Sequence, residues 1–237
     1  MKKLISFLLV AILAVPAFAQ SLDKLLKEYF DAVGQDKLVK IEFIKATGNI
    51  VQMGIEIPFI MYNKRPNSYR TEGTFQGMTF IQAYNGTDGY TINPFSGSTE
   101  PQPLSPDELK SMKVQADIDG VLWNYKEKGN KVSLEADQDV EGTPCYTIKI
   151  ITSDSDQYLY YIDKESYMSI KNSSIVKVQG ADVESDTYMS NFLKVDGVVL
   201  PGKIESRYQG ETTMVININS YELNTKLDDS LFGPPTK

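Results

Sequence analysis

The sequence predicts a mostly β (α+β) fold, in which one long, curved antiparallel sheet carries an N-terminal helix and a short helical insertion. Apolar and polar residues alternate through most of the chain after residue 39, which is the period of half-buried strands. Glycine-containing turn pairs separate these stretches, as expected where tight turns join antiparallel strands. About a dozen strands in one sheet must curl or close.

Residues 1–19 have the pattern of a secretory signal peptide and are not expected to belong to the fold. Two lysines precede an apolar run over residues 4–15, and Ala17-Phe18-Ala19 forms a cleavage site. The apolar run is too short to span a bilayer. Because no cysteine lies near the cleavage site, we expect no lipid anchor. The expected product is a soluble periplasmic domain of residues 20–237.

Composition excludes several classes of function. The net charge is −7, and it becomes −9 without the signal peptide, which contains two lysines and no acids. Such acidity disfavours nucleic acid and anionic membrane surfaces as partners. The absence of histidine excludes Ser-His-Asp and Cys-His catalysis and the usual histidine-bearing zinc sites. The lone Cys145 cannot form an intramolecular disulfide, and we expect it to be a buried strand residue.

No catalytic or metal site is expected. Asp117-Ile118-Asp119-Gly120 resembles a fragment of a calcium loop, but the later acidic ligands of such a loop are missing, so a turn or helix start is favoured. Ser153-Asp154-Ser155-Asp156 is interpreted as a solvated hairpin loop. No pattern places two carboxylates across a cleft, as a carboxylate-only hydrolase requires. We therefore expect a protein that is not an enzyme and needs no cofactor.

The chain after the signal peptide begins with an amphipathic helix. Its apolar residues recur at helical spacing and form one stripe, and Gly34 fits the position just past the helix end. A helix with one apolar stripe must lie against another apolar surface, such as a sheet. The stripe consists of Leu22, Leu25, Leu26, Tyr29, Phe30 and Val33.

Strands follow the helix. Alternation over residues 39–43 predicts a first strand, and alternation over residues 51–61 predicts a long strand with six large apolar side chains on one face. Pro58, on the other face of this strand, suggests an edge or a bulge. Further strands are predicted at 68–75, 78–84, 88–93, 131–137, 144–151, 157–162, 168–178, 183–194, 198–208 and 212–223.

A helical insertion interrupts the strands. Ser105 and Glu108 form a capping box around Pro106, which suits the first helical turn, so a helix is predicted over 106–113. A second helical or irregular segment is predicted over 116–126. Two or three short helices cover a wide apolar sheet only partly, unless the covered space is a cavity, which is a first hint of a binding protein. The alternative is that helices and sheet pack fully and leave no cavity.

Residues 62–104 contain three motifs in order: Lys64-Arg65-Pro66-Asn67 before an aromatic strand, then an Asn85-Gly86 turn, and Asn93-Pro94-Phe95 ahead of the helical insertion. In these motifs the chain resembles the periplasmic lipoprotein-carrier (LolA-like) family. The tail, with Leu231-Phe232 followed by two prolines, is also similar. The order of elements agrees over nearly the whole mature chain, whereas the detailed motifs cover about fifty residues. The stretch between Asn93-Pro94-Phe95 and the helical insertion departs from the family pattern.

The resemblance implies an unclosed antiparallel β-barrel of about eleven strands, with short lid helices over an apolar cavity. In that family the cavity takes acyl chains of lipoproteins from an inner-membrane release complex and passes them to an outer-membrane acceptor. The family's lid-holding arginine corresponds to Arg65, whose partner in the lid the sequence leaves open. We expect a monomer that binds lipoprotein acyl chains, does not bind nucleic acid and does not insert stably into membranes.

Specific residues are assigned to this cavity and its lid. The apolar side chains of the lid, with the adjacent Val114, would fill the empty cavity and so offset a gain of roughly 12 kcal/mol from burying a sixteen-carbon chain. The expected lid residues are Leu109, Met112, Val121, Leu122 and Trp123. The expected cavity residues are Ile41, Phe43, Val51, Met53, Ile55, Ile57, Phe59 and Met61.

Two other functions remain open from the sequence. One is a periplasmic regulator that senses lipid or lipoprotein with the same half-barrel and signals through a protein partner. The other is a structural half-barrel with a filled core that transports nothing. Fold alone does not decide between them.

Overall fold

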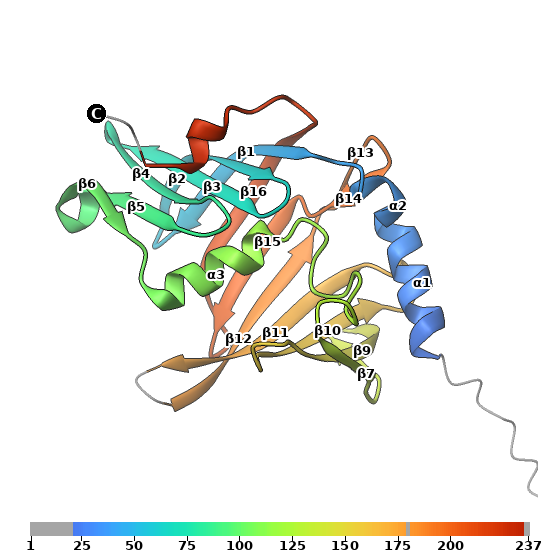
Figure 1. Ribbon diagram of the computed structural model, residues 1–237. Coiled ribbons are helices and arrows are strands. Elements are labelled where there is room, and N and C mark those ends of the chain that lie inside the picture. Colours follow the sequence, from blue (N-terminus) through green and yellow to red (C-terminus); the bar gives the residue numbers. More distant parts are fainter. Residues whose placement is uncertain (1–20, 179–180, 235–237) are drawn as a thin grey trace, which may run out of the picture.

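The computed structural model describes residues 21–178 and 181–234, and it confirms the predicted fold class. The expected signal peptide lies outside these residues. One antiparallel sheet of fourteen strands dominates the fold (Figure 1). Its strands are β1 (Phe43–Gln52), β2 (Ile55–Lys64), β3 (Ser68–Phe75), β4 (Met78–Tyr84), β5 (Gly89–Asn93), β6 (Ser98–Pro103), β7 (Lys131–Leu134), β8 (Gln138–Val140), β9 (Thr143–Ile151), β10 (Gln157–Asp163), β11 (Ser169–Val178), β12 (Ala181–Ser190), β15 (Lys203–Tyr208) and β16 (Glu211–Leu223).

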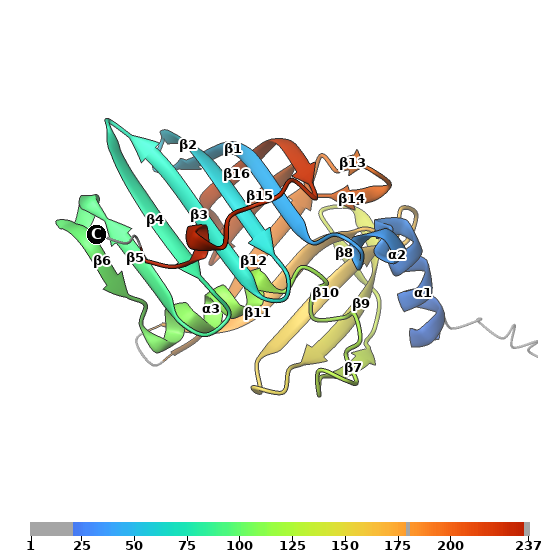
Figure 2. The same ribbon diagram turned by 45° about the horizontal axis from the view of Figure 1, so that its top comes forward.

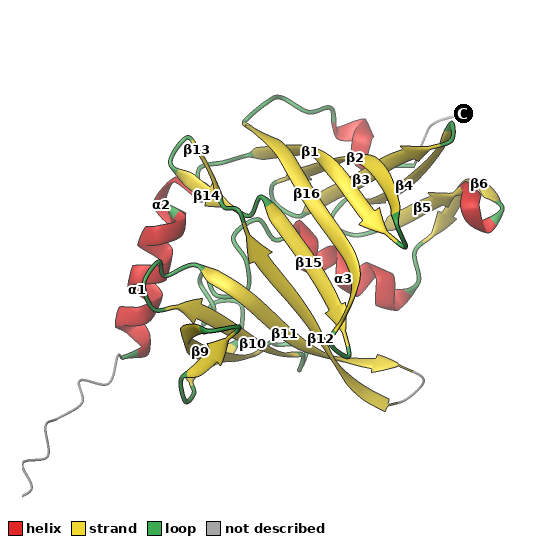
Figure 3. Cartoon of the chain, turned by 180° about the vertical axis from the view of Figure 1, so that it is seen from behind, coloured by secondary structure: helices red, strands yellow, loops and turns green. Residues whose placement is uncertain are grey.

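The sheet is open and bent into two walls. Its order is β6-β5-β4-β3-β2-β1-β16-β15-β12-β11-β10-β9-β7, with β8 also pairing with β9, and the end strands β6 and β7 do not pair with each other. We call β1–β6 the first wall and β7–β12 the second wall. Strands β15 and β16 join the two walls, as the view from behind shows (Figure 3). The predicted number of about eleven strands is too low.

The two longest helices lie on one side of this sheet (Figures 1 and 2). Helix α1 (Leu22–Val33) has Ser21 as its N-cap and Gly34 in the left-handed conformation as its C-cap. Its Leu25 and Leu26 pack with Ile148 and Ile150 of the second wall. The other helical elements are α2 (Gln35–Leu38), α3 (Pro106–Ala116), η1 (Pro94–Ser96) and η2 (Asp229–Phe232), and a separate hairpin consists of β13 (Leu193–Val195) and β14 (Val198–Leu200).

Two predicted strands at the start of the sheet are wrong, and two later ones, 183–194 and 198–208, are each divided between the main sheet and the β13–β14 hairpin. Residues 35–38 form α2 and Val39 keeps helical angles, so the first strand begins only at Phe43. The predicted long strand over 51–61 is a hairpin, since Met53 and Gly54, at φ 51° and 76°, turn the chain between β1 and β2. Both turn residues have positive φ, which is the geometry of a two-residue hairpin that matches strand twist. The alternation of apolar residues continues through this turn and hides it.

The helical insertion is only partly as predicted. Helix α3 begins with the predicted capping box of Ser105 and Glu108, and the hydrogen bonds from Ser105 lower the pKa of Glu108. It extends to Ala116, three residues past the predicted end. The segment 117–129 contains turns and no helix. Asp117-Ile118-Asp119-Gly120 is therefore a turn, one of the two structures predicted for it.

Candidate functional site

The face of the sheet that contacts α1 and α3 is called the concave face here. Cross-strand pairs such as Ala46 with Met61 and Ile50 with Ile57 place alternate residues of each strand on this face. Several of its apolar side chains are only half-buried, so α1 and α3 cover the face incompletely. These side chains are Ile50, Ile57, Phe80, Met189, Ile204, Met214 and Ile216.

Helix α3 covers one end of the first wall. Met112 and Ala116 are buried against Tyr69 and Tyr84, with Leu104 completing the cluster. A second cluster, of Phe59, Ala46 and Ile218 with half-buried neighbours, contains no residue of α3. Helix α3 therefore covers the half of the concave face near the β2–β3 turn, and it does not cover the other half.

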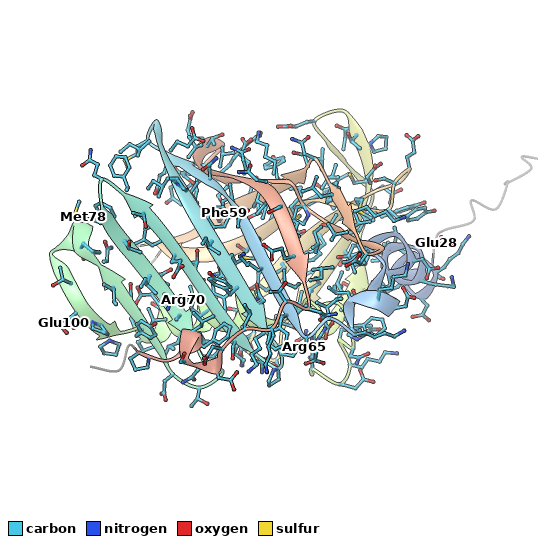
Figure 4. The ribbon with its side chains drawn as sticks, turned by 90° about the horizontal axis from the view of Figure 1, so that it is seen from above. Glu28, Phe59, Arg65, Arg70, Met78 and Glu100 are labelled. Carbon is cyan, nitrogen blue, oxygen red and sulfur yellow. The ribbon has the colours of Figure 1, made fainter. Side chains whose placement is uncertain are left out.

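The Arg65 side chain, in the β2–β3 turn, donates four hydrogen bonds to three groups from other parts of the chain. Its Nη1 and Nη2 donate to the two carboxylate oxygens of Asp119, each at 2.7 Å. Its Nη2 also donates to the Leu38 carbonyl at 3.0 Å, and Nε donates to the Ile41 carbonyl at 2.7 Å. The hydrogen bonds to Asp119 raise the pKa of Arg65 further. Arg65 thus links β2, the α2 end and the loop after α3 (Figure 4).

The Arg65–Asp119 pair is well placed to stabilise the lid. Both side chains are mostly shielded from water, with 19% and 17% of their surfaces exposed. A guanidinium and a carboxylate in this parallel arrangement form strong, directional hydrogen bonds. Gln35 Nε2 donates to the same carboxylate at 3.4 Å. Displacing the loop after α3 would leave Asp119 without these donors, so the pair stabilises the observed position of this loop.

A second contact holds α3 itself. Asn63, two residues before Arg65, is buried, and its Nδ2 donates to the Gln115 carbonyl at 2.8 Å, at the end of α3. This bond satisfies a carbonyl that the helix end leaves without an intrahelical partner. The end of β2 therefore anchors both the last turn of α3 and the loop that follows.

Two ion pairs connect α3 to the second wall. Lys110 lies 2.5 Å from Asp156, and Lys113 lies 3.3 Å from Asp154, both in the β9–β10 turn. Their side chains are largely exposed, so each pair contributes little and is weakened by salt. The predicted solvated loop at 153–156 thus also receives the lid. Helix α3 spans the mouth of the half-barrel from one wall to the other (Figure 1).

The predicted cavity residues divide into three groups. Phe59 and Ile41 are buried, and Met61 and Ile57 lie half-buried on the concave face.

Phe43 and Val51 pair with Lys64 and Glu56, and this register puts them on the opposite face of the sheet. Met53 and Ile55 lie at the β1–β2 hairpin tip, with 93% and 42% of their surfaces exposed. The turn at Met53 explains the positions of Phe43, Val51 and Met53, because it puts the odd-numbered residues of β1 and β2 on opposite faces. Ile55 stays on the concave side but lies exposed at the tip.

The predicted lid residues lie in two separate places. Leu109 and Met112, on α3, pack against the first wall. Val121 and Leu122 pack with α1 and the second wall, and Trp123 meets Phe30 edge-on at a ring distance of 5.0 Å. Val121, Leu122 and Trp123 are part of the core around α1, so only the α3 residues Leu109 and Met112 remain candidates for a lid. Val114, also assigned to the lid, is 41% exposed.

Several residues of this site were missed by the sequence interpretation. Asp119 and Asn63 carried no signal beyond a turn and a strand end. Lys110 and Lys113 lie on the predicted helix over 106–113, and nothing in the sequence assigns them a partner. Their partners lie 41 to 54 residues away in the sequence, and local patterns do not specify such pairing.

A cavity of about 560 Å³ opens on the opposite face of the second wall. Thr147, Lys149, Leu159 and Ser173 are among its lining residues, and they alternate along their strands with side chains of the concave face. The buried Thr147 hydroxyl has no hydrogen-bond partner in the part of the chain that the structure describes. This cavity is separate from the lid.

Within residues 21–178 and 181–234, no group of three or more Cys, Asp or Glu side chains is placed to hold a metal ion. Within the same ranges, every helix is too short or too polar to cross a membrane.

Comparison with known proteins identifies the fold. No protein-family model and no curated protein matches the sequence. A LolA superfamily protein from Nitrosomonas europaea matches with a TM-score of 0.60 at 14% identity, covering 90% of this chain and 98% of that one. A DUF1329 family protein from Desulfovibrio piger matches with a TM-score of 0.60 at 13% identity, over 88% and 96% of the two chains.

A third solved structure agrees with these two. It is a putative outer membrane lipoprotein-sorting protein domain from Vibrio parahaemolyticus, with a TM-score of 0.56 at 12% identity, covering 88% of this chain and 97% of that one. Structural similarity at this low sequence identity identifies the fold, and function has to be argued from the site residues. The open sheet, the lid helix and these matches together show that the chain has the LolA-like fold.

Proposed function

We propose that this protein is a periplasmic carrier that binds the acyl chains of lipoproteins on its concave face and moves them toward the outer membrane. The observation that carries the proposal is the incompletely covered apolar concave face beside a lid that Arg65 holds through Asp119. An open apolar surface is costly in water unless a ligand covers it. The role assigned here is binding, without catalysis or cofactor.

The lid gives such a carrier a means of release. Burial of an acyl chain gains about 0.8 kcal/mol per methylene, so a long chain on a fully open apolar face would dissociate very slowly. Met112 and Leu109 occupy part of the concave face when α3 is closed, and ligand must displace them. The free energy lost when α3 and the Arg65–Asp119 pair open reduces net affinity. Hand-off to an acceptor becomes possible because closing the lid expels the ligand.

The experiment is a binding titration with two probes, an apolar fluorophore and a diacylated lipopeptide, on protein purified from a periplasm without detergent. We expect wild-type protein to bind both in its folded state. Arg65→Leu should open the lid and increase the affinity for both probes several-fold. Arg207→Leu is the matched control, because Arg207 makes comparable ion pairs with Glu205 and Glu141 but contacts no residue of the lid.

Two outcomes would contradict the proposal. Wild-type protein that binds neither probe would indicate a filled core and a structural role. Binding that Arg65→Leu and Arg207→Leu leave equally unchanged would show that Arg65 does not control access. A regulator that senses lipoprotein predicts probe binding without transfer to acceptor membranes, so a transfer assay separates this alternative from a carrier.

A further inference from the structure

Three hairpin tips of the first wall lie at the same end of the sheet. Because neighbouring antiparallel strands run in opposite directions, the turns after β1, β3 and β5 share one end, and the turn that contains Arg65 lies at the other. Met78 and Arg65 are accordingly seen at opposite ends of the first wall (Figure 4). The ends of these hairpins project freely (Figure 2).

The tips carry large apolar side chains in water. Met53 is 93% exposed, Phe95 47%, Ile55 42% and Met78 37%. The half-buried Phe75 contacts Phe95 with ring centroids 6.3 Å apart, which joins the second tip to η1. We call these five side chains the apolar rim. They include four of the six large apolar side chains that are most exposed in the described residues.

Charge is almost absent around the apolar rim. Segments 49–57, 73–81 and 91–99 contain no lysine or arginine and a single acid, Glu56. The whole chain contains 24 basic and 31 acidic residues, so these three segments are much poorer in charge than the rest of the sequence. The polar residues of these three segments are threonine, asparagine, glutamine and serine, apart from Glu56, and their side chains can hydrogen-bond to lipid headgroups. Insertion of this end into a bilayer interface would therefore bury no basic group.

The apolar rim is continuous with the concave face. Along β2, Ile55, Ile57 and Phe59 alternate onto the concave side, and exposure falls from the tip to the buried Phe59. The half-buried Ile50 lies opposite Ile57 across the hairpin. Helix α3 contacts the other end of these strands. An apolar path thus leads from the exposed tips to the uncovered half of the concave face.

We propose that the apolar rim docks on the surface of an uncharged phospholipid bilayer by inserting Met53, Ile55, Met78 and Phe95 among the lipids. Three separate projecting tips suit a fluid surface that closes around each one, whereas a protein partner would need a matching socket for each. Acyl chains would then pass between bilayer and concave face without crossing water, a step that rests on the proposed function. Docking itself does not depend on that function.

The test is flotation of the full exported protein with phosphatidylcholine vesicles, at about 0.1 M and about 1 M salt. We expect binding that is reversible and is not weakened by salt or by the omission of anionic lipid, because the tips contain no cation. Met53→Lys and Phe95→Lys should each reduce the bound fraction by about tenfold, through loss of apolar burial and the cost of inserting charge. Met53→Leu should retain binding.

Val114→Lys is the matched control, since Val114 is 41% exposed but lies on α3. Unchanged unfolding temperatures would show that each variant is folded. Absence of vesicle binding by wild-type protein, or equal binding by Met53→Lys and Val114→Lys, would overturn the proposal, and the first result would leave a protein surface as the partner of the apolar rim. Binding that requires anionic lipid would also overturn it.

A parallel titration with an apolar fluorophore in vesicle-free solution separates this inference from the proposed function. Lysine at the rim should abolish docking and leave fluorophore uptake unchanged. Wild-type protein that docks but takes up no fluorophore would contradict the carrier function while supporting the rim. Wild-type protein that takes up fluorophore but does not bind vesicles would contradict only the proposed docking of the apolar rim.

Discussion

The Arg65 guanidinium and the Asp119 carboxylate face each other across two hydrogen bonds of 2.7 Å, which join the β2–β3 turn to the loop after α3. The same guanidinium also binds two carbonyls near α2. One side chain therefore joins the loop after α3 to the start of β1. Arg65 lies at the end of the sheet, and Asp119 lies in the loop that follows α3.

Asp119→Asn should therefore weaken the closed lid while leaving the sheet intact. The amide keeps one acceptor but loses the charge and the second acceptor, which is expected to cost about 1–3 kcal/mol of closed-lid stability. Hydrogen exchange of residues 106–119 should accelerate about 5-fold to 150-fold, since each 1.4 kcal/mol changes an opening equilibrium tenfold. Exchange within β10 serves as the internal control. Equal acceleration in both segments would indicate global destabilisation and contradict a lid role.

The two exposed ion pairs of α3 should have a smaller and salt-dependent effect. Pairs as exposed as Lys110–Asp156 and Lys113–Asp154 typically contribute about 0.2–1 kcal/mol each. Lys110→Gln with Lys113→Gln should therefore accelerate exchange in α3 only a few-fold at low salt, and the difference from wild type should vanish at about 1 M salt. The Asp119→Asn effect should persist at that salt, because its pair is mostly buried. A salt-independent effect of the lysine changes would show that the two pairs do not act electrostatically.

The fold class was predictable because it depends on short-range patterns. The stripe of α1, its Gly34 cap and the capping box of α3 are local, and the structure contains all three. The hairpin at Met53 was missed since Val51, Met53 and Ile55 continue a strand-like alternation through the turn. Only the positive φ of Met53 and Gly54 reveals it, and a methionine in that position gives no turn signal.

The site was less predictable than the fold. Arg65 was identified through the family resemblance, but its partner was not, because 54 residues separate it from Asp119. The sequence also does not show that the predicted lid residues belong to two separate clusters. Leu122 and Met112 have similar apolar character, and only the tertiary structure shows that Leu122 joins the core around α1 while Met112 covers the first wall.

Cys145 should be unreactive in the folded protein. Its side chain is fully buried, and desolvation raises the pKa of the thiol to about 11. Only the thiolate reacts with alkylating or disulfide reagents, so labelling at pH 8 should be slow in native buffer and fast in denaturant. The labelling rate then reports global unfolding, which gives a stability measurement for every variant above. Rapid labelling in native buffer, with α1 and the lid unperturbed, would contradict the buried position of Cys145.

Glu205 should make stability depend on pH in the acidic range. Hydrogen bonds from Lys203, Arg207 and Thr212 lower its pKa from 4.5 to about 2. A depressed native pKa contributes stability above the unfolded value, and this stability is lost as pH falls through the native value. Glu205→Gln should cost about 1–2 kcal/mol at pH 7, after allowance for solvent screening.

The cost should shrink between pH 4.5 and about 2, the window that the pKa of Glu205 defines. Glu56→Gln at the hairpin tip is the control, because Glu56 is exposed and should give no such change. A Glu205→Gln cost that stays constant from pH 7 to pH 2 would show that the lost stability does not come from the carboxylate charge.

Gly34→Ala and Gly54→Ala separate two reasons for a glycine in a turn, which are a positive φ and the close approach of another backbone segment. Both glycines have nearly the same positive φ, 75° and 76°, so alanine meets the same backbone strain of about 1–2 kcal/mol at each. An added Cβ at Gly34 would lie 2.2 Å from the Gly197 carbonyl oxygen, whereas one at Gly54 would meet nothing within 4 Å. Gly34→Ala must therefore also displace the β13–β14 turn from the end of α1.

We expect the free energy of unfolding to fall by about 1 kcal/mol in Gly54→Ala and by at least about 3 kcal/mol in Gly34→Ala, measured by denaturant titration with Cys145 labelling. The excess at Gly34 isolates the contact with Gly197, since the strain at the two positions is matched. A double variant that combines Gly34→Ala with deletion of Gly197 would remove the contact between residue 34 and the Gly197 carbonyl, and it would also remove the β13–β14 turn. Equal costs for the two alanine variants would show that the β13–β14 hairpin moves away freely and does not hold the end of α1.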